Sequence, residues 1–298
     1  MSSSGLTRRS YPKDSRVKHG NDIAVRRRFM NLKKYLALTR LGMMEKLHYR
    51  LGTFVTLFGN LVYLVLIYFL WKAIYASSGT DVVNGMTLND TLVYLVLATA
   101  LFNFLEVFLV WDMSREIQSG AIVLKLLKPM SFRGYSFWSY FGENVMSFFL
   151  TFVPTFIIIN ILTGGYIALG VNLLFFVISV LMALVLNFSV DMIVATICLY
   201  TESTWGINMV KECIVLLLSG ASIPLAFFPE GLRAAVQYLP FRCIYDTPLS
   251  VLLCKPGFTF GTGLGFALLL QLTWCVVLGA VGALFWRVSL KKITVNGG

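Results

Sequence analysis

Charge is scarce in this chain of 298 residues: only 13% of its residues are charged, whereas hydrophobic residues make up 57%. Soluble domains average roughly 25% charged and about 45–50% apolar residues. A soluble fold of this length has too little interior to hide so much apolar surface. The mean hydropathy of +0.77 agrees with this excess. The composition therefore excludes an ordinary soluble domain and predicts a protein embedded in a membrane.

Residues that build catalytic and metal sites are also scarce. The two histidines, His19 and His48, stand apart in the N-terminal part, so we expect neither a metal site nor a Ser-His-Asp triad. The five cysteines form no CxxC pair. A disulfide between Cys243 and Cys254 stays open, because sequence spacing does not show geometry. The sequence has no G-x-x-x-x-G-K-[ST] loop, so it does not hold nucleotide phosphates in the P-loop manner.

The positive charge is concentrated at segment ends. The net charge is +11, and about half of the 25 lysines and arginines precede residue 51. Such a distribution is typical of cytoplasmic loops and of contact with anionic lipid head groups. We therefore expect a lipid bilayer, and no nucleic acid, as the partner of these charges.

Six apolar stretches predict membrane-spanning helices, because each is rich in apolar residues and nearly free of charge. They lie at 52–75, 91–112, 137–163, 171–200, 207–218 and 263–286. Trp71 and Tyr75 suit the far interface of the first span. Pro154 predicts a kink in the third span, since membrane helices tolerate proline.

The segments between the spans predict the topology. Residues 1–27 are expected to be a disordered, basic cytoplasmic tail. In 28–50, apolar residues at helical spacing alternate with Lys and Arg, which predicts an amphipathic helix in the cytoplasmic interface. A polar helix that simply leads into the first span stays open. The segments assigned to the cytoplasm hold 21 of the 25 Lys and Arg, which predicts an inner (plasma) membrane protein with both termini cytoplasmic.

The region 219–257 fits no simple span. Five prolines divide it into pieces of about one or two helical turns. Non-helical backbone at membrane depth survives only where protein or a water-filled cavity covers it. The predicted fold class is therefore all-α integral membrane, with six transmembrane helices, an N-terminal cytoplasmic interfacial helix and a re-entrant outer hairpin between spans five and six.

Three motifs carry a family resemblance. They are REIQSGAIVLKLLKP (Arg115 to Pro129), LSGASIPLAFFPEGL (Leu218 to Leu232) and LPFRCIYDTP (Leu239 to Pro248). In this order the chain resembles permeases of ABC transporters of the second exporter class, in the ABC-2 family and its viologen-exporter-like branch. The resemblance covers about residues 28–298, which we take as an ABC exporter-type transmembrane domain.

The resemblance implies a permease subunit without enzymatic activity of its own. It implies that ATP and Mg are bound by a separate ABC ATP-binding subunit, that this chain holds no cofactor, and that a second permease chain completes a homodimer or heterodimer. It places an ATPase-coupling helix at about 116–127, although an ordinary cytoplasmic loop helix stays open. The coupling residues would be Arg115, Glu116, Ile117, Gly120, Ile122, Leu124 and Leu127.

The resemblance also makes the hairpin an outer gate. The residues assigned to it are Gly220, Pro224, Phe228, Pro229, Pro240, Phe241, Tyr245 and Pro248.

Three carboxylates within the apolar stretches are candidates for the translocation path: Glu106, Glu143 and Asp191. A charge at the bilayer centre is costly, so each is expected to face a partner or water. They either line the translocation path or pair between helices, for example Glu143 or Asp191 with Lys211. An ion-coupled secondary transporter that uses these carboxylates as a proton relay is the alternative function, and a membrane-embedded lipid enzyme is a third. The transported substrate stays open.

Overall fold

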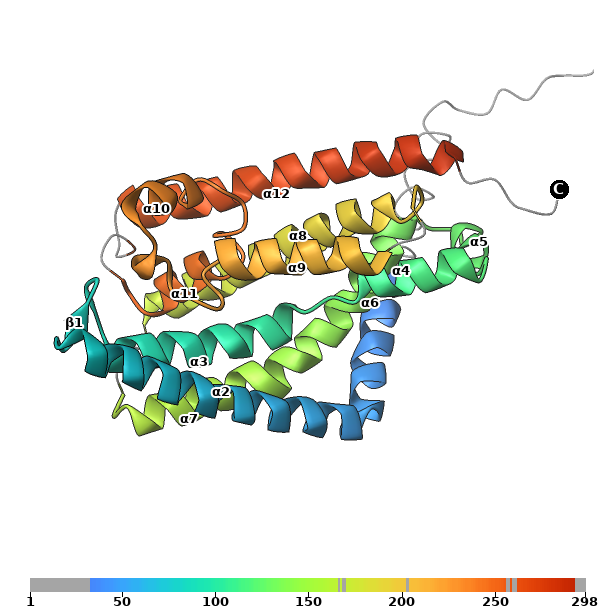
Figure 1. Cartoon of the computed structure of the whole chain (residues 1–298). Coiled ribbons are helices and arrows are strands. Elements are labelled where there is room, and N and C mark those ends of the chain that lie inside the picture. Colours follow the sequence, from blue (N-terminus) through green and yellow to red (C-terminus); the bar gives the residue numbers. More distant parts are fainter. Residues whose placement is uncertain are drawn as a thin grey trace, which may run out of the picture.

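The computed structural model shows a bundle of long helices that run side by side (Figure 1). It describes residues 33–165, 167, 170–201, 204–255, 258 and 262–292. The predicted tail at 1–27 lies outside the described residues, as does the start of the predicted interfacial helix. The only sheet among the described residues is a two-stranded ribbon. The prediction of an essentially all-helical protein is confirmed.

The labelled elements follow one another along the chain. They are α2 (Arg50–Ser78), β1 (Val82–Val83), β2 (Met86–Thr87), α3 (Leu88–Leu105), α4 (Leu109–Gln118), α5 (Ile122–Leu126), α6 (Phe132–Ser147), η1 (Phe148–Phe152), α7 (Val153–Leu162), α8 (Val171–Ile197), α9 (Thr204–Leu218), η2 (Leu225–Phe227), α10 (Glu230–Val236), α11 (Asp246–Leu252), α12 (Thr262–Ser289) and η3 (Leu290–Lys292).

Five helical stretches are long and apolar enough to cross a membrane. They are Leu51–Ser78, Leu88–Gln118, Phe132–Leu162, Val171–Ile197 and Gly263–Ser289. The predicted fifth span corresponds to α9, which has 15 residues. At 1.5 Å per residue it covers about 22 Å, less than the roughly 30 Å of a hydrocarbon core. The count of six spans therefore stays a prediction.

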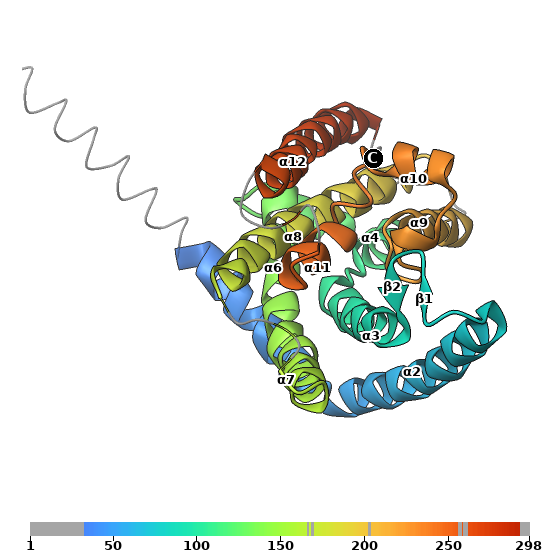
Figure 2. The same ribbon diagram turned by 90° about the vertical axis from the view of Figure 1, so that its left-hand side faces the viewer.

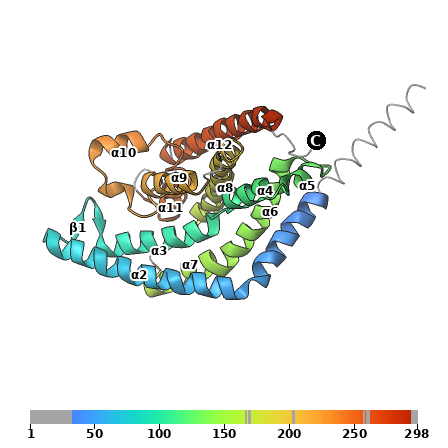
Figure 3. The ribbon, with the colours of Figure 1, turned by 45° about the vertical axis from the view of Figure 1, so that its right-hand side comes forward.

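A further helix over residues 33–48 lies across the direction of the long helices (Figures 1 and 3). It packs tightly on α6, where added Cβ atoms on Gly42 and Gly142 would collide with the backbone of the other helix. The rings of Tyr35 and Trp138 stack beside this crossing, with centroids 5.7 Å apart. Two glycines thus let the helix cross one end of the bundle, which is the orientation that an interfacial helix requires.

Two of the long stretches are not regular helices throughout. Residues 106–108 are non-helical, so the second stretch consists of α3 and α4. In the third stretch, the π-helical turn η1 immediately precedes Pro154, which lies in the first turn of α7. A π-helical turn adds one residue to the ring closed by each hydrogen bond, and proline cannot donate such a bond. The third span is therefore distorted where the proline predicted it.

The region after α9 consists of short pieces gathered at the end of the bundle that carries β1 and β2. Figure 2, which views the bundle from that end, shows α10 at the periphery and α11 near the centre. Every residue of α11 is buried, and α11 packs against α8 and α3. This broken arrangement agrees with the predicted hairpin, although whether it re-enters a membrane stays a prediction.

The first span's aromatic residues pack against the rest of the protein. Trp71 and Tyr75, predicted at the lipid interface, are buried in the protein core. The Tyr75 hydroxyl donates to the Met86 carbonyl at 2.9 Å, and the Trp71 and Phe227 ring centroids are 4.6 Å apart. They join α2 to the β-ribbon and to η2, so both side chains contact protein rather than lipid, and their location at the membrane interface stays a prediction.

Candidate functional site

The predicted coupling helix is interrupted at Gly120. Helix α4 ends at Gln118 and α5 begins at Ile122. Gly120 has φ +73°, a left-handed conformation that glycine adopts without steric cost. Its N–H donates to the Ile117 carbonyl at 3.1 Å, which closes the end of α4. The prediction of one helix over 116–127 is therefore wrong, because the segment consists of the end of α4, a glycine turn and the short helix α5.

The apolar side chains of this segment divide into two groups. Leu124 and Leu127 are 69% and 76% exposed. Ile122 is buried in a cluster that includes Met113 of α4, and Ile117 packs against that cluster. Leu124 and Leu127 are therefore the most exposed apolar side chains of the segment, whereas the two isoleucines pack against their own chain.

The charged side chains of the segment pair within the chain. Glu116 forms an ion pair with Lys125 across the glycine turn, and Arg115 forms one with Asp112 in the preceding turn of α4. The Lys125 ammonium also lies over the Tyr135 ring, 5.5 Å from its centroid. The contacts of Lys125 with Glu116 and Tyr135 thus hold α5 against α4 and α6.

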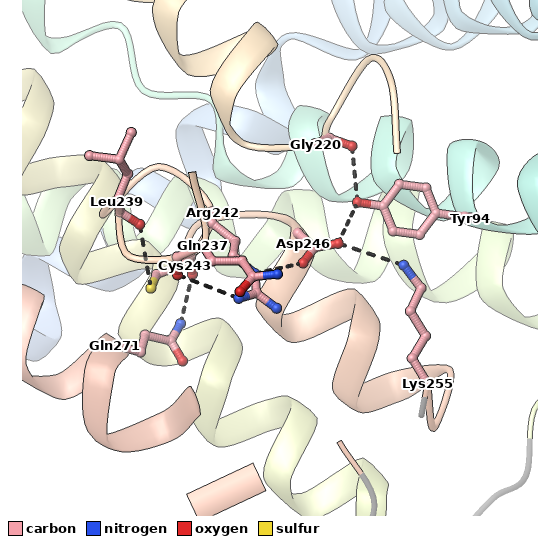
Figure 4. A network of polar contacts seen from close by, with 9 residues as sticks. All are labelled: Tyr94, Gly220, Gln237, Leu239, Arg242, Cys243, Asp246, Lys255 and Gln271. Carbon is pink, nitrogen blue, oxygen red and sulfur yellow. Dashed lines mark hydrogen bonds and ion pairs between the residues drawn. The ribbon is translucent and has the colours of Figure 1, made fainter. Parts of the chain in front are cut away.

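A buried polar network joins the segments around α11, with the Asp246 carboxylate at its centre (Figure 4). Arg242 Nε donates to Asp246 Oδ2 at 3.0 Å, and Lys255 Nζ lies 3.6 Å from Oδ1. The Tyr94 hydroxyl of α3 lies 3.3 Å from Oδ1 and donates to the Gly220 carbonyl at 2.9 Å. The network thus ties α3 to the turn after α9, to α11 and to the segment before α12.

The Asp246 side chain is only 6% exposed, and its positively charged neighbours offset the effect of this burial on its pKa. Burial alone would raise the pKa of the Asp246 carboxyl, but Lys255 and Arg242 lower it below its ordinary value. The carboxylate therefore stays ionised inside the protein.

A second buried link holds the same region to α8 and α12. Gln271 is fully buried, and its Nε2 donates to the carbonyls of Ser179 at 2.8 Å and Cys243 at 2.9 Å. Cys243 and Cys254 are both free thiols, so the disulfide that the sequence left open is not formed.

The eight residues predicted for the outer gate occupy different environments. Five are buried, two are half-buried and one is exposed. The half-buried residues are Phe228 and Phe241, and the exposed one is Pro229. The buried residues are Gly220, Pro224, Pro240, Tyr245 and Pro248. Of these eight residues, Tyr245 lines a small cavity together with Glu106 and Asp191.

This cavity, of about 60 Å³, lies between α8, α9 and the α3–α4 break. Lys211 Nζ donates to Asp191 Oδ1 at 2.8 Å, so the predicted pairing of Asp191 with Lys211 is confirmed. The other Asp191 oxygen has no partner among the described residues. A buried ion pair thus connects α8 to α9.

Glu106 and Glu143 are arranged differently. Glu106 is exposed and begins the non-helical residues 106–108, where Asn187 Nδ2 donates to the Leu105 carbonyl at 2.7 Å. This bond satisfies a backbone acceptor that the break frees. Glu143 is half-buried on α6 and forms no ion pair in the described part of the chain. The three predicted path carboxylates therefore do not form one cluster.

Comparison with protein families matches residues 61–297 to the ABC-2 family transporter proteins. The chain belongs to this family. A search of the curated proteins finds no match. As a member of the ABC-2 family, the chain is a multi-pass membrane protein of the kind that forms the membrane subunit of an ABC transporter system.

Several residues that organise this ABC-2 protein escaped the sequence analysis. Tyr94 and Gln271 lie in apolar spans, and Arg242 and Lys255 lie in the segment 219–257, where the sequence analysis assigned them no role. A polar side chain such as Gln271 inside an apolar run was the available signal, because such residues are rarely left without a partner in a membrane. The long separation between Tyr94 and Asp246 left no comparable signal for their contact.

Proposed function

We propose that the chain is the permease subunit of an ATP-driven exporter, in which a partner subunit binds ATP and Mg and hydrolyses the ATP. The observation that carries this proposal is the pair of exposed leucines, Leu124 and Leu127, on a short helix held at one end of the bundle. Exposed apolar residues on an otherwise anchored element are typical of a protein-binding site. The family membership and the lack of a P-loop motif support a separate ATPase as the protein that binds there.

The contacts around α4 provide a route for the motion. Helix α5 is fixed to α4 by the Glu116–Lys125 pair, and α4 packs on α8 and α9. Ser114 of α4 and Thr204 of α9 share a hydrogen bond of 2.8 Å. Closure of the ATPase would displace α5 and α4 together, and α9 would carry the displacement to the network around Asp246. The hairpin would then act as the outer gate.

The proposed assembly places this end of the bundle in the cytoplasm. The helix over 33–48 and the end of α12 lie at the same end as α5 (Figure 1). The excess of Lys and Arg in the segments at that end supports a cytoplasmic location of both termini in the inner (plasma) membrane. A second permease chain, identical or different, would complete the path.

Co-purification tests this function. The variant Leu124→Asp/Leu127→Asp replaces two exposed leucines, and Leu232→Asp makes the same change at a 46% exposed leucine of α10, at the opposite end. Each chain is purified from native membranes in mild detergent, and its partners are identified by mass spectrometry. We expect a nucleotide-binding subunit with wild type and Leu232→Asp, and at least tenfold less with the double variant. Recovery of no such subunit with a folded wild-type chain would refute the proposal.

One observation favours the alternative of an ion-coupled secondary transporter. The α3–α4 break places Glu106 beside non-helical backbone within a long apolar stretch, and broken helices form ion sites in such transporters. That function predicts transport in vesicles stripped of the ATPase, and loss of transport on adding an uncoupler. ATP-dependent transport that survives the uncoupler would exclude it.

A further inference from the structure

A groove of about 390 Å³ lies between α2, α3, α9 and the turn that follows α9. We name it the amide groove after its two asparagines, Asn60 and Asn103. Its lining combines polar, aromatic and aliphatic side chains, none of which is charged. The residues that matter below are Asn60, Tyr63, Thr99, Phe102, Asn103 and Ser222.

Asn60 and Asn103 lie well inside the long apolar stretches Leu51–Ser78 and Leu88–Gln118. Asn60 is ten residues after the start of α2, and Asn103 is fifteen residues after the start of α3. At 1.5 Å per residue these positions are about 15 Å and about 22 Å along their helices. Amide side chains at such depth face protein, ligand or water rather than lipid tails, because hydrocarbon offers them no hydrogen bond.

Much of the hydrogen-bonding capacity in the groove is unused. Asn103 Nδ2 donates to the Thr99 carbonyl at 2.8 Å, and its side-chain oxygen has no donor among the described residues. The side chains of Asn60, Tyr63 and Ser222 form no hydrogen bond within the described part of the chain. Donors and acceptors from three different elements therefore face one space.

The absence of charge from the lining restricts what the groove takes. The neighbouring cavity that contains Asp191 and Lys211 shares only Phe102 with it. A charged ligand in the groove would lose its hydration without gaining a counter-ion, whereas an uncharged ligand would not. The volume lies within the range of small-molecule sites, about 300–1,000 Å³.

We propose that the amide groove binds an uncharged amphiphile of small-molecule size. Its hydrogen-bonding groups pair with Asn60, Asn103 and Ser222, and its apolar body lies against Phe102. As a statement about the transported substrate class, this inference rests on the proposed export function. As a statement about binding, it stands on the groove alone.

Photolabelling of the full chain in phosphatidylcholine nanodiscs tests the inference. The probe is hydroxymethyl-benzophenone, an uncharged two-ring molecule with one hydroxyl and one ketone. Its trimethylammonium and carboxylate derivatives serve as cationic and anionic twins. We expect saturable labelling of peptides from α2 and α3 by the neutral probe, and at least tenfold weaker labelling by either twin.

The variants Asn60→Leu and Asn103→Leu keep the branched side-chain shape and the number of heavy atoms and remove the amides. Each lost hydrogen bond should weaken binding of the neutral probe by about five- to tenfold. Thr56→Val is the matched control on α2, because its exposed hydroxyl already donates to the Gly52 carbonyl at 3.0 Å. Thermal unfolding of all three variants shows whether the fold is kept.

Equal labelling by the cationic twin would overturn the proposal, and so would unchanged labelling in both asparagine variants. A third contrary result would be that the asparagine variants lose dimers but not labelling. The last would mean that a second copy of the chain fills the groove. Because the assay contains no ATPase, its outcome is independent of the co-purification experiment. If the probe binds but no ATPase co-purifies, only the export function is refuted. If an ATPase co-purifies but the probe does not bind, only the proposal of a binding groove is refuted.

Discussion

Replacing Gly220 by alanine should destabilise the protein strongly. Gly220 has φ +80°, and an added Cβ would lie 2.9 Å from the Tyr94 hydroxyl and 3.2 Å from Leu225 Cγ. The left-handed backbone costs an alanine roughly 1–2 kcal/mol. Displacing Tyr94 leaves the Gly220 carbonyl unpaired, which costs about 1–3 kcal/mol more. We expect Gly220→Ala to lower the free energy of unfolding by about 2–5 kcal/mol, measured by detergent titration in mixed micelles.

The control separates backbone strain from the collision. Gly79 has φ +66° but no atom within 4 Å of an added Cβ, so Gly79→Ala should cost only the roughly 1–2 kcal/mol of strain. In a Tyr94→Phe background the hydroxyl is absent, and Gly220→Ala should cost less than in the wild type. Equal losses for Gly220→Ala and Gly79→Ala, with no dependence on Tyr94, would refute the reasoning.

Three further predictions concern buried polar groups. Lys211→Gln should lower the free energy of unfolding by about 3–5 kcal/mol, because it leaves Asp191 charged and buried. In a double-mutant cycle, adding Asp191→Asn should restore part of this loss. The pKa of Asp246 is lowered on folding, so the wild type should lose stability as the pH falls below the ordinary value of 3.8 toward the folded pKa. In acid titrations of unfolding, Asp246→Asn should lose less stability over the same pH range. Gln271→Leu should cost about 1–3 kcal/mol in thermal unfolding, because it removes the buried hydrogen bonds to the Ser179 and Cys243 carbonyls. An unchanged unfolding temperature would contradict the link that Gln271 forms.

The long helices were predictable because apolar composition alone defines them. The stretch predicted at 263–286 corresponds to Gly263–Ser289, and the one at 171–200 to Val171–Ile197. Pro154 likewise indicated the distorted third stretch, since its missing N–H is a property of one residue. Local chemistry thus determines where these helices lie and where this one is irregular.

The α3–α4 break was not predictable by the same means. Its sequence, LFNFLEVFLV, holds neither proline nor glycine. The break is stabilised by Asn187, a residue of α8 that is distant in sequence and caps the Leu105 carbonyl. The Asp246 network has the same character, because Tyr94 meets its partners only after α3, α11 and the turn after α9 have packed together.

The coupling segment combines both cases. Gly120 was recognised as a landmark, but its left-handed conformation, and hence the division into α4 and α5, depended on the backbone. The apolar pattern also gave no sign that Ile122 faces inward while Leu124 faces outward. Five residues of helix are too short for a hydrophobic pattern to define a buried face.

Site-specific cross-linking from Leu124 tests the central claim most directly. A photoreactive amino acid replaces Leu124 in living cells, and the same substitution at Leu232 is the control for the opposite end of the bundle. The account predicts that the probe at residue 124 forms an adduct with an ATP-binding protein, identified by mass spectrometry, and that the probe at residue 232 does not. Adducts at residue 124 with lipid alone, in a correctly folded chain, would contradict the account.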